Sequence, residues 1–182
     1  MKRVLQAGAA LVALSAMNAW ATQADAAIYG RVSLGQSGGE IEGVTLDDGT
    51  AYGAALGTSL GPVRIEAGVD HIAGSINFGP MISAEALDYH ATAYLDLPIG
   101  EHASLFAGAG LDYVDGQASF FGTDVEASGD GWHWAAGGAY RLNDRMIAEA
   151  QYRHVSADLD ADFVGAADLD ADVVTLGLRL AL

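Results

Sequence analysis

A histidine and a serine stand two residues apart in the C-terminal part of the chain, in His154-Val155-Ser156. A histidine beside a serine can act as general base to a nucleophilic hydroxyl, and a carboxylate bound to the ring can hold the required tautomer. A surface histidine beside a loop serine is the simpler interpretation, and both stay open. The other four histidines have no metal-ligand spacing and are expected to fill the interior or an interface: His71, His90, His102 and His133. The chain has no cysteine, which excludes thiol nucleophiles, zinc–thiolate sites and disulfides.

An acidic hexapeptide occurs twice, as Ala157-Asp158-Leu159-Asp160-Ala161-Asp162 and as Ala167-Asp168-Leu169-Asp170-Ala171-Asp172. If the two copies form one hairpin, all their aspartates share one face, and like charges directly opposite each other destabilise a sheet. The stretch is therefore either a solvated external loop or a place where Ca²⁺ or Mg²⁺ bridges the carboxylates to one another or to lipid phosphates. It lacks the Asp-x-Asp-x-Asp-Gly pattern of a dedicated calcium loop, so cation binding would be weak. The candidate cation ligands are Asp158, Asp160, Asp162, Asp168, Asp170 and Asp172.

The elements that carry these residues are predicted to be strands, because hydrophobicity alternates with period two along most of the chain. In each segment one set of alternate residues is aliphatic or aromatic, and the other set is glycine, small or charged. The pattern predicts eight strands at 28–35, 52–60, 63–70, 87–97, 104–113, 132–142, 146–153 and 173–182.

The predicted connections alternate between short and long. Short turns are expected at 61–62, 98–101 and 142–144, and longer loops at 37–48, 74–82, 115–130 and 156–171. Three short and four long connections join eight strands into an antiparallel up-and-down meander whose two ends lie on the short-turn side. Short turns on one side and longer loops on the other are typical of outer-membrane barrels.

The first 26 residues have the organisation of a secretory signal peptide. Lys2 and Arg3 precede an apolar run from Val4 to Met17, and Ala24-Asp25-Ala26 offers a small-x-small cleavage site. The run is too short to span a bilayer as a helix, which needs about 20 apolar residues. We expect cleavage after Ala26, with Ala21 as a second possibility, and a single barrel domain over 27–182.

Composition restricts the function classes. The 182 residues carry 24 acidic and 8 basic side chains, a formal net charge of −16, so binding to nucleic-acid phosphates is not expected. Hydrophobic residues make up 51% of the chain, which excludes a disordered acidic tail. The 24 glycines are well above the usual share.

Alternation alone does not decide which face points inward. A soluble lipocalin-like barrel would enclose the apolar face, whereas a membrane barrel would expose it to lipid. The inverted, membrane arrangement is favoured because the polar set is rich in glycine and alanine, which leave room in a narrow lumen for long charged side chains. The charges predicted to face the lumen are Arg31, Arg64, Glu66, Asp70, Asp88, Asp96, Asp112, Arg141, Glu149, Arg153 and Arg179. The aromatic residues predicted to form a lipid-facing girdle are Tyr52, Tyr89, Tyr113, Trp132, Trp134, Tyr140 and Tyr152.

The chain from residue 27 resembles the eight-stranded outer-membrane barrels of the opacity-protein and outer-membrane protein A transmembrane-domain type. The residues that carry the resemblance are 148–153 (AEAQYR) and 175–182 (TLGLRLAL). The resemblance implies residence in the bacterial outer membrane, contact with lipopolysaccharide, and a last strand recognised by the barrel-assembly machinery. Its signal residues would be Gly177, Leu178, Leu180 and Leu182, with Leu182 in place of the family's usual terminal aromatic residue.

Three functions follow from this barrel. The main expectation is a structural or surface-exposed protein without enzymatic activity or cofactor, whose paired lumen charges form a plug or at most a narrow pore, and whose loops meet an unidentified partner. A second is a hydrolase, because His154 and Ser156 resemble the His-x-Ser element of the lipid A 3-O-deacylases, which implies Asp168 as the third member; the family's next asparagine is Ala157 here. A third is passage of small hydrophobic molecules through a lateral opening, with Phe106 and Tyr94 as an apolar patch in the lumen.

Overall fold

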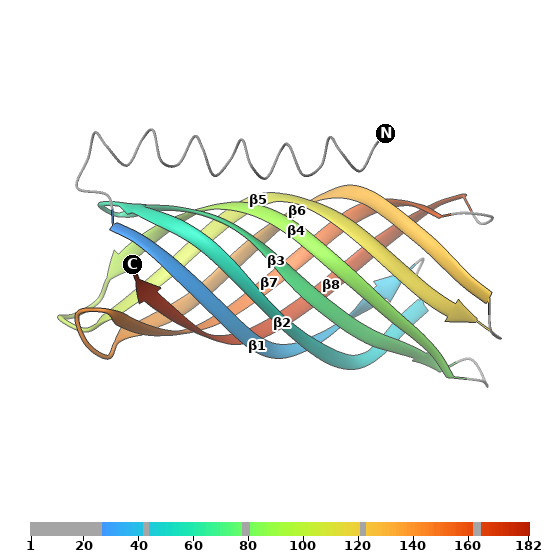
Figure 1. Ribbon diagram of the computed structural model, residues 1–182, viewed down its shortest axis with the longest axis horizontal. Coiled ribbons are helices and arrows are strands. Elements are labelled where there is room, and N and C mark those ends of the chain that lie inside the picture. The colour runs from blue at the N-terminus through green and yellow to red at the C-terminus, as the bar shows by residue number, and fades with distance from the viewer. Residues whose placement is uncertain (1–26, 42–43, 78–80, 121–122, 162–164) are drawn as a thin grey trace.

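The computed structural model describes residues 27–41, 44–77, 81–120, 123–161 and 165–182. These residues form one closed antiparallel sheet in which each strand pairs with its sequence neighbours and β1 also pairs with β8 (Figure 1). The strands are β1 (Ala27–Ile41), β2 (Val44–Leu60), β3 (Val63–Asn77), β4 (Met81–Pro98), β5 (Ala103–Phe120), β6 (Thr123–Arg141), β7 (Met146–Ala161) and β8 (Gly165–Ala181). The predicted all-β, eight-stranded up-and-down barrel is confirmed, whereas the expected signal peptide lies outside the described residues.

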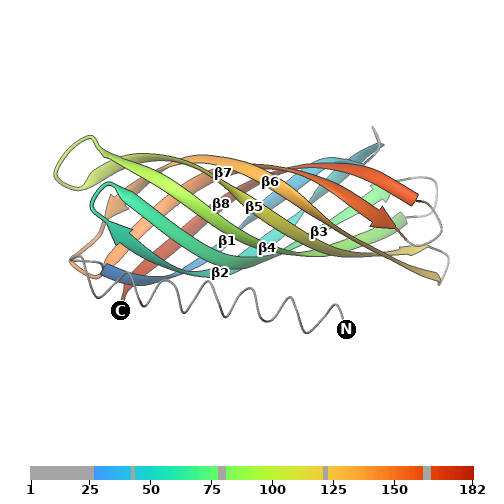
Figure 2. The same cartoon turned by 90° about the horizontal axis from the view of Figure 1, so that it is seen from above.

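The tilt of the strands follows from the register of the ladder. Hydrogen-bonded partners traced once around the wall from Ile28 lead back to β1 at Gly38, ten residues further along. A stagger of this size in an eight-stranded barrel corresponds to a strand tilt of about 40–45°. Figures 1 and 2 show the strands running obliquely to the long axis of the barrel. The start of β1 and the C-terminus lie at the same end of the barrel, together with the three short turns.

The four long connections are not the loops that we predicted. In the structure the strands continue through most of 37–48, 74–82, 115–130 and 156–171, and pairing extends to Ile41–Val44, Asn77–Met81, Phe120–Thr123 and Ala161–Gly165. The physical reason is that each antiparallel ladder satisfies its own backbone donors and acceptors, so pairing persists beyond the apolar segment even where the side chains are polar. Glycine- and aspartate-rich composition alone suggested loops.

The barrel is therefore taller than a bilayer requires. Strands of 15–19 residues, tilted as above, span about 40 Å, while the apolar band of a membrane barrel is about 25 Å tall. The outward residues Tyr52, Tyr89, Trp132 and Trp134 mark one edge of this band near mid-strand, and Tyr140 lies at the short-turn end. The hairpin ends of all strands project beyond the band.

The outer face within the band is apolar, as the membrane arrangement predicts. Between the two aromatic levels the exposed outward side chains are mainly leucine, valine and isoleucine, with Leu34, Leu111 and Leu176 each at least 65% exposed. The inward face carries the buried charged residues. Among the described residues, no helix is long and apolar enough to cross a membrane.

Candidate functional site

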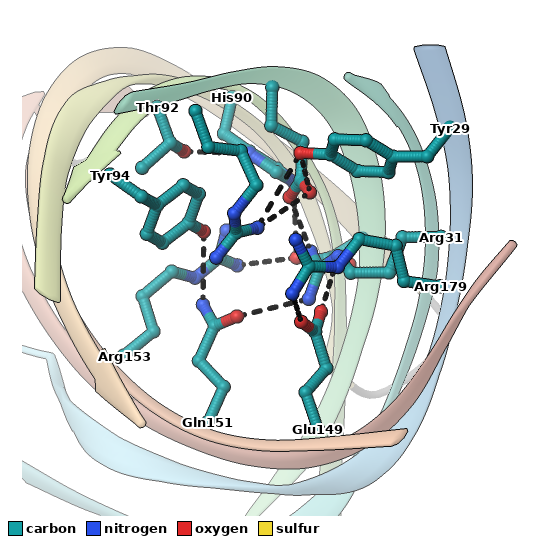
Figure 3. Close-up of polar contacts among 12 residues, drawn as sticks. Tyr29, Arg31, His90, Thr92, Tyr94, Glu149, Gln151, Arg153 and Arg179 are labelled. Carbon is teal, nitrogen blue, oxygen red and sulfur yellow. Dashed lines mark hydrogen bonds and ion pairs between the residues drawn. The ribbon is translucent and has the colours of Figure 1, made fainter. Parts of the chain in front are cut away.

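The interior of the barrel is the candidate site, because side chains from all eight strands converge there. Figure 3 shows arginine, tyrosine, histidine and carboxylate side chains pointing from opposite walls toward one another across the lumen. Many of them have less than 5% of their surface exposed, including Arg31, Arg64, Glu66, Asp88 and His133. Buried charges persist only when paired and hydrogen-bonded, so their partners define what the interior does.

The lower charge layer, nearer the short turns, contains three guanidinium groups and three carboxylates. Glu66 forms an ion pair with Arg31 (Nη2 to Oε1, 3.0 Å) and accepts a hydrogen bond from Arg64 (Nη1 to Oε2, 3.3 Å). Glu149 forms an ion pair with Arg179 (Nη2 to Oε2, 3.1 Å), and its Oε1 lies 3.8 Å from Nε of Arg31. The residues of this layer are Arg31, Arg64, Arg179, Glu66, Glu149 and Asp96, whose charges balance.

Neutral groups complete this layer. The hydroxyl of Tyr29 donates to Glu66 at 3.1 Å, and Gln151 accepts from Arg31 at 3.0 Å and donates to Tyr94 at 3.3 Å. Each arginine therefore contacts partners from more than one strand, and the contacts tie opposite walls of the barrel together.

The rings of Tyr94 and Phe106 lie against the guanidinium group of Arg64. The guanidinium carbon of Arg64 lies 4.0 Å from the ring centroid of Tyr94 and 5.0 Å from that of Phe106, within the range of cation–π contacts. The two rings pack edge to face with Ala135 and Ala139 beside them. Every neighbouring strand pair around the described wall is hydrogen-bonded, so this patch faces no lateral gap there.

The upper charge layer, nearer the long hairpins, has a different balance. Arg153 donates from Nη2 to Asp88 at 2.6 Å and forms an ion pair with Asp70 at 2.8 Å. These two aspartates lie directly opposite each other on β3 and β4. The Nδ1 atom of His133 lies 2.7 and 2.8 Å from the two oxygens of Asp112. The residues of this layer are Arg153, Asp70, Asp88, Asp112, His90 and His133.

Glycine provides the room that these large side chains occupy. A Cβ added to Gly68 would overlap His90, one added to Gly110 would overlap His133, and one added to Gly177 would crowd Glu149. In all three cases the glycine lies directly across the ladder from the strand that carries the larger residue. The glycine enrichment of the inward face thus reflects steric demand, as the sequence pattern indicated.

An apolar cluster lies in the interior beyond the upper charge layer, toward the long hairpins. Val114, Ala157 and Leu159 are buried together, and Ala86 and Leu169 pack against them. Val155 and Val173 are also buried, with 1–2% of their surface exposed. Sequence analysis did not single out this cluster, although its members continue the inward alternation of their strands beyond the predicted ends.

One residue assigned to the lumen lies elsewhere. Arg141 has inward parity, but it is the last residue of β6 and is exposed at the short-turn mouth, where it lines a small recess with His102 and Ile147. Parity predicts direction, whereas position along the strand decides whether a side chain is inside the wall. The other ten charges assigned to the lumen have inward parity and are buried, except Asp96, whose side chain is 21% exposed.

His154 and Ser156 lie on the outer face of β7 at the edge of the apolar band. The Nδ1 atom of His154 is 2.8 Å from Oδ1 of Asp172, and the hydroxyl of Tyr152 donates to the same oxygen at 2.6 Å. Asp168, the acid predicted by spacing, instead lies opposite Asp158, four residues further along the ladder. Asp172 takes the place expected for Asp168 because the ladder of β7 and β8 extends through this segment and brings Asp172 opposite His154.

The aspartate repeats face outward on the paired hairpin. Asp158 and Asp168 are directly opposite, Ser156 faces Asp170, and Asp162 lies outside the described residues. Within the described ranges, no group of three or more histidine or acidic side chains is placed to hold a metal ion. Asp158 and Asp168 thus form the one carboxylate pair across the described part of this ladder, and Asp160 lies opposite Ala166.

The repeats belong to a larger acidic surface. The hairpin segments 36–51, 71–87, 114–131 and 154–173 contain no lysine or arginine. Exposed outward carboxylates are present on every hairpin, among them Glu40, Glu85, Asp115 and Asp130. The part of the barrel beyond the aromatic band is therefore uniformly acidic.

The C-terminal strand places its leucines toward lipid. Leu176, Leu180 and Leu182 are exposed and Leu178 is half-buried, while Gly177 faces inward opposite Glu149. The amide of Leu182 donates to the carbonyl of Ile28 at 3.0 Å, which closes the barrel at its end.

Several solved structures have the same fold as this chain. Neisserial surface protein A is 14% identical with a TM-score of 0.72 and covers 85% of this chain and 97% of its own. OprG of Pseudomonas aeruginosa is 14% identical with a TM-score of 0.57 and covers 86% and 95%. Ail, the attachment invasion locus protein of Yersinia pestis, solved with the heparin analogue sucrose octasulfate, is 15% identical with a TM-score of 0.52 and covers 84% and 99%.

No curated protein sequence matches the chain significantly. The family described as "Outer membrane protein beta-barrel domain" matches residues 7–181, nearly the whole chain. Together with the apolar outer band and the closed sheet, this match places the protein in the outer membrane. The chain belongs to the outer-membrane β-barrel family.

Proposed function

We propose that the protein is a non-conducting surface scaffold, a barrel with a closed interior that holds four acidic hairpins above the outer membrane. The observation that carries this proposal is the sequence of three filled levels in the lumen: the lower charge layer, the upper charge layer and the apolar cluster around Val114 and Leu159. Ions would have to break buried ion pairs and then wet an apolar constriction, and both steps are costly.

Conductance of the refolded protein in a planar lipid bilayer tests closure. We expect no discrete conductance steps in molar potassium chloride. The matched control is the double variant Arg31→Ala, Arg153→Ala, which shortens the long side chains of the two charge layers and should admit ions. Discrete steps from the parent protein would overturn the closed-lumen proposal.

The hairpins suit partners without negative charge. Ail was solved with the heparin analogue sucrose octasulfate, which is a polyanion. The hairpin segments of this chain carry carboxylates and no lysine or arginine. We therefore propose that the protein excludes polyanions and meets lipopolysaccharide phosphates only through bridging divalent cations, and that it is inserted by the barrel-assembly machinery. Sucrose octasulfate binding by calorimetry, with Ail as positive control, should give no heat; measurable binding would contradict the proposal.

A second candidate function rests on the geometry at His154. Its Nδ1 bonds to Asp172, as the orienting acid of a serine hydrolase does, and Ser156 follows on the same face beside the lipid boundary. The substrate class for such a site would be an ester of an outer-leaflet lipid. Asp172 takes the role that spacing assigned to Asp168.

Release of fatty acid from purified lipopolysaccharide by the refolded protein tests this second candidate. Activity would have to disappear in Ser156→Ala and fall strongly in Asp172→Asn. Ser128→Ala, an outward serine on β6, is the matched control and should keep the activity of the parent. No release above the Ser156→Ala background would exclude the hydrolase and leave the scaffold proposal intact.

A further inference from the structure

The lipid-facing wall has a hollow of about 480 Å³ near the short-turn end, over β5, β6, β7 and β8. At its floor, Gly138 on β6 and Ala150 on β7 are partners in the ladder. Leu105 on β5 lies next to Gly138, and Leu176 on β8 lies next to Ala150. Both leucines are at least half exposed, so they stand on either side of two small residues. We call this hollow, with Tyr140 at its short-turn end, the wall groove.

The wall groove has the shape and the surroundings of a site for an acyl chain. Its volume lies within the range of roughly 300–1,000 Å³ that small-molecule sites occupy, and its outward-facing lining side chains are aliphatic apart from Tyr140. A void at this place would forfeit the dispersion contacts of the atoms around it. Inside a bilayer such packing, rather than the hydrophobic effect, drives association. A chain seated between the two leucines contacts the protein on three sides, whereas a chain on a flat wall contacts it on one.

The exposed arginines of the protein stand at the short-turn end of the wall groove. The part of the chain that the structure describes has six arginines and no lysine, and four of the arginines are buried in the lumen. The other two, Arg141 and Arg145, are exposed on either side of the turn between β6 and β7. This turn lies at the end of the barrel that also holds the C-terminus (Figure 1). Glu101 and Asp144 are exposed on the same side, but in the described structure neither carboxylate pairs with these arginines.

Neighbouring contacts connect the arginines to the wall groove. Arg141 directly follows Tyr140, whose ring centroid lies 6.1 Å from that of His102. The small recess that Arg141 and His102 line shares Ala103 with the wall groove. The apolar floor and the positive charge therefore adjoin, one at the depth of acyl chains and the other where the strands leave the apolar band.

We propose that the wall groove binds one phospholipid molecule, with an acyl chain between Leu105 and Leu176 and the phosphate at Arg141 and Arg145. Guanidinium groups bind phosphate through charge-assisted, often bidentate hydrogen bonds. Lipid phosphates lie at the edge of the apolar band, which is the depth of the two arginines. The charge at this edge identifies the occupant as a lipid with a phosphate headgroup. The site depends neither on a closed lumen nor on the hydrolase candidate.

Native mass spectrometry of the refolded protein tests the proposal, with dipalmitoyl phosphatidylglycerol added to the detergent micelles as the probe. We expect one lipid per barrel to stay bound after the detergent is removed. Dipalmitoyl glycerol, which has the same chains and no phosphate, should be retained much less. A protein without retained lipid, a series of adducts with no preferred number, or a protein dimer in place of the lipid adduct would overturn the proposal.

Variants that fill the wall groove test its position. Ala150→Leu places a large side chain between the two leucines and should abolish the single lipid adduct. Ala148→Leu fills the same groove from its short-turn side and should act in the same way. Ala91→Leu, at an exposed outward position of β4, is the matched control and should keep the adduct. Equal retention in the filled variants and in Ala91→Leu would refute the groove as the site.

A second pair of variants tests the headgroup contact. An arginine near the membrane surface strengthens the binding of anionic lipid roughly fivefold. The double variant Arg141→Gln, Arg145→Gln should therefore weaken retention of phosphatidylglycerol by about this factor for each arginine removed. Arg141→Lys, Arg145→Lys keeps both charges and is the matched control, with a much smaller loss. Unchanged retention in the glutamine variant would overturn the assignment of the phosphate to these arginines.

Discussion

At the residue scale, Glu149 is the carboxylate of the lower charge layer that lies close to arginines of both β1 and β8. Its removal in Glu149→Ala leaves Arg179 with the 3.9 Å contact to Asp96 and the ring of Tyr29, and it weakens the surroundings of Arg31. Leaving a buried charge unpaired costs on the order of 3–5 kcal/mol. Urea unfolding in lipid vesicles should show this loss, and Glu101→Ala, at an exposed short turn, should show none. Equal unfolding midpoints for Glu149→Ala and the parent would contradict the network.

Also at the residue scale, the glycines of the inward face differ from those of the outward face. Gly110→Ala would push a methyl group into the His133 ring, and we expect a loss of about 1–3 kcal/mol from overpacking. Gly138→Ala is the matched control, because the atoms nearest to the added methyl group, on Leu105 and Ser104, would be 3.9 Å away. Thermal unfolding of the two variants in one detergent compares them. Equal midpoints would show that the interior can accommodate the added methyl group.

At the element scale, β8 presents one leucine face to lipid. Leu178→Arg places a charge within the apolar band and should cost about 2–4 kcal/mol, whereas Leu182→Arg lies at the water interface and should cost much less. Deletion of Leu182 should mainly slow assembly in cells, since Leu182 adds one terminal hydrogen bond to Ile28. Folded yields in cells and unfolding in vesicles separate the two effects. An equal yield for the deletion and the parent would count against an assembly role.

The hairpin of β7 and β8 gives a second prediction at this scale. Asp158 and Asp168 face each other on a paired ladder, and calcium at millimolar levels should relieve their repulsion and protect residues 157–172 from protease. The embedded strands should be unaffected. The variant Asp158→Asn, Asp168→Asn is the control and should be protected without calcium. Cleavage that is unchanged by calcium would mean that the aspartates are only solvated.

At the scale of the whole molecule, the paired hairpins lengthen the closed sheet and should make it resistant to unfolding by detergent. We expect the unheated protein to migrate faster on a denaturing gel than the heated protein, because the closed sheet survives detergent until it is unfolded thermally. Protease added to intact cells should cut only in the hairpin tips and never at the short turns around Pro62, Gly100 or Asn143. Cleavage at those turns would reverse the proposed orientation of the barrel.

The sequence by itself determined the strand number, the order of the strands and the face of each residue. Period-two alternation is a local property, and a one-residue slip would move a whole apolar set into the lumen, so Arg31, Glu66 and Glu149 could be assigned inward from parity alone. The same alternation identified Leu176 and Leu180 as lipid-facing.

Only the tertiary structure decided which inward residues meet and how far the strands run. Arg153 pairs with Asp70 and Asp88 because the stagger of the wall brings β7 and β3 to the same height, and that stagger is a property of the closed ladder. Asp172 rather than Asp168 bonds to His154, and His133 reaches Thr92, for the same reason. The inward or outward direction of a side chain follows from the alternation of neighbouring residues, whereas contacts across the lumen depend on the closure of all eight strands.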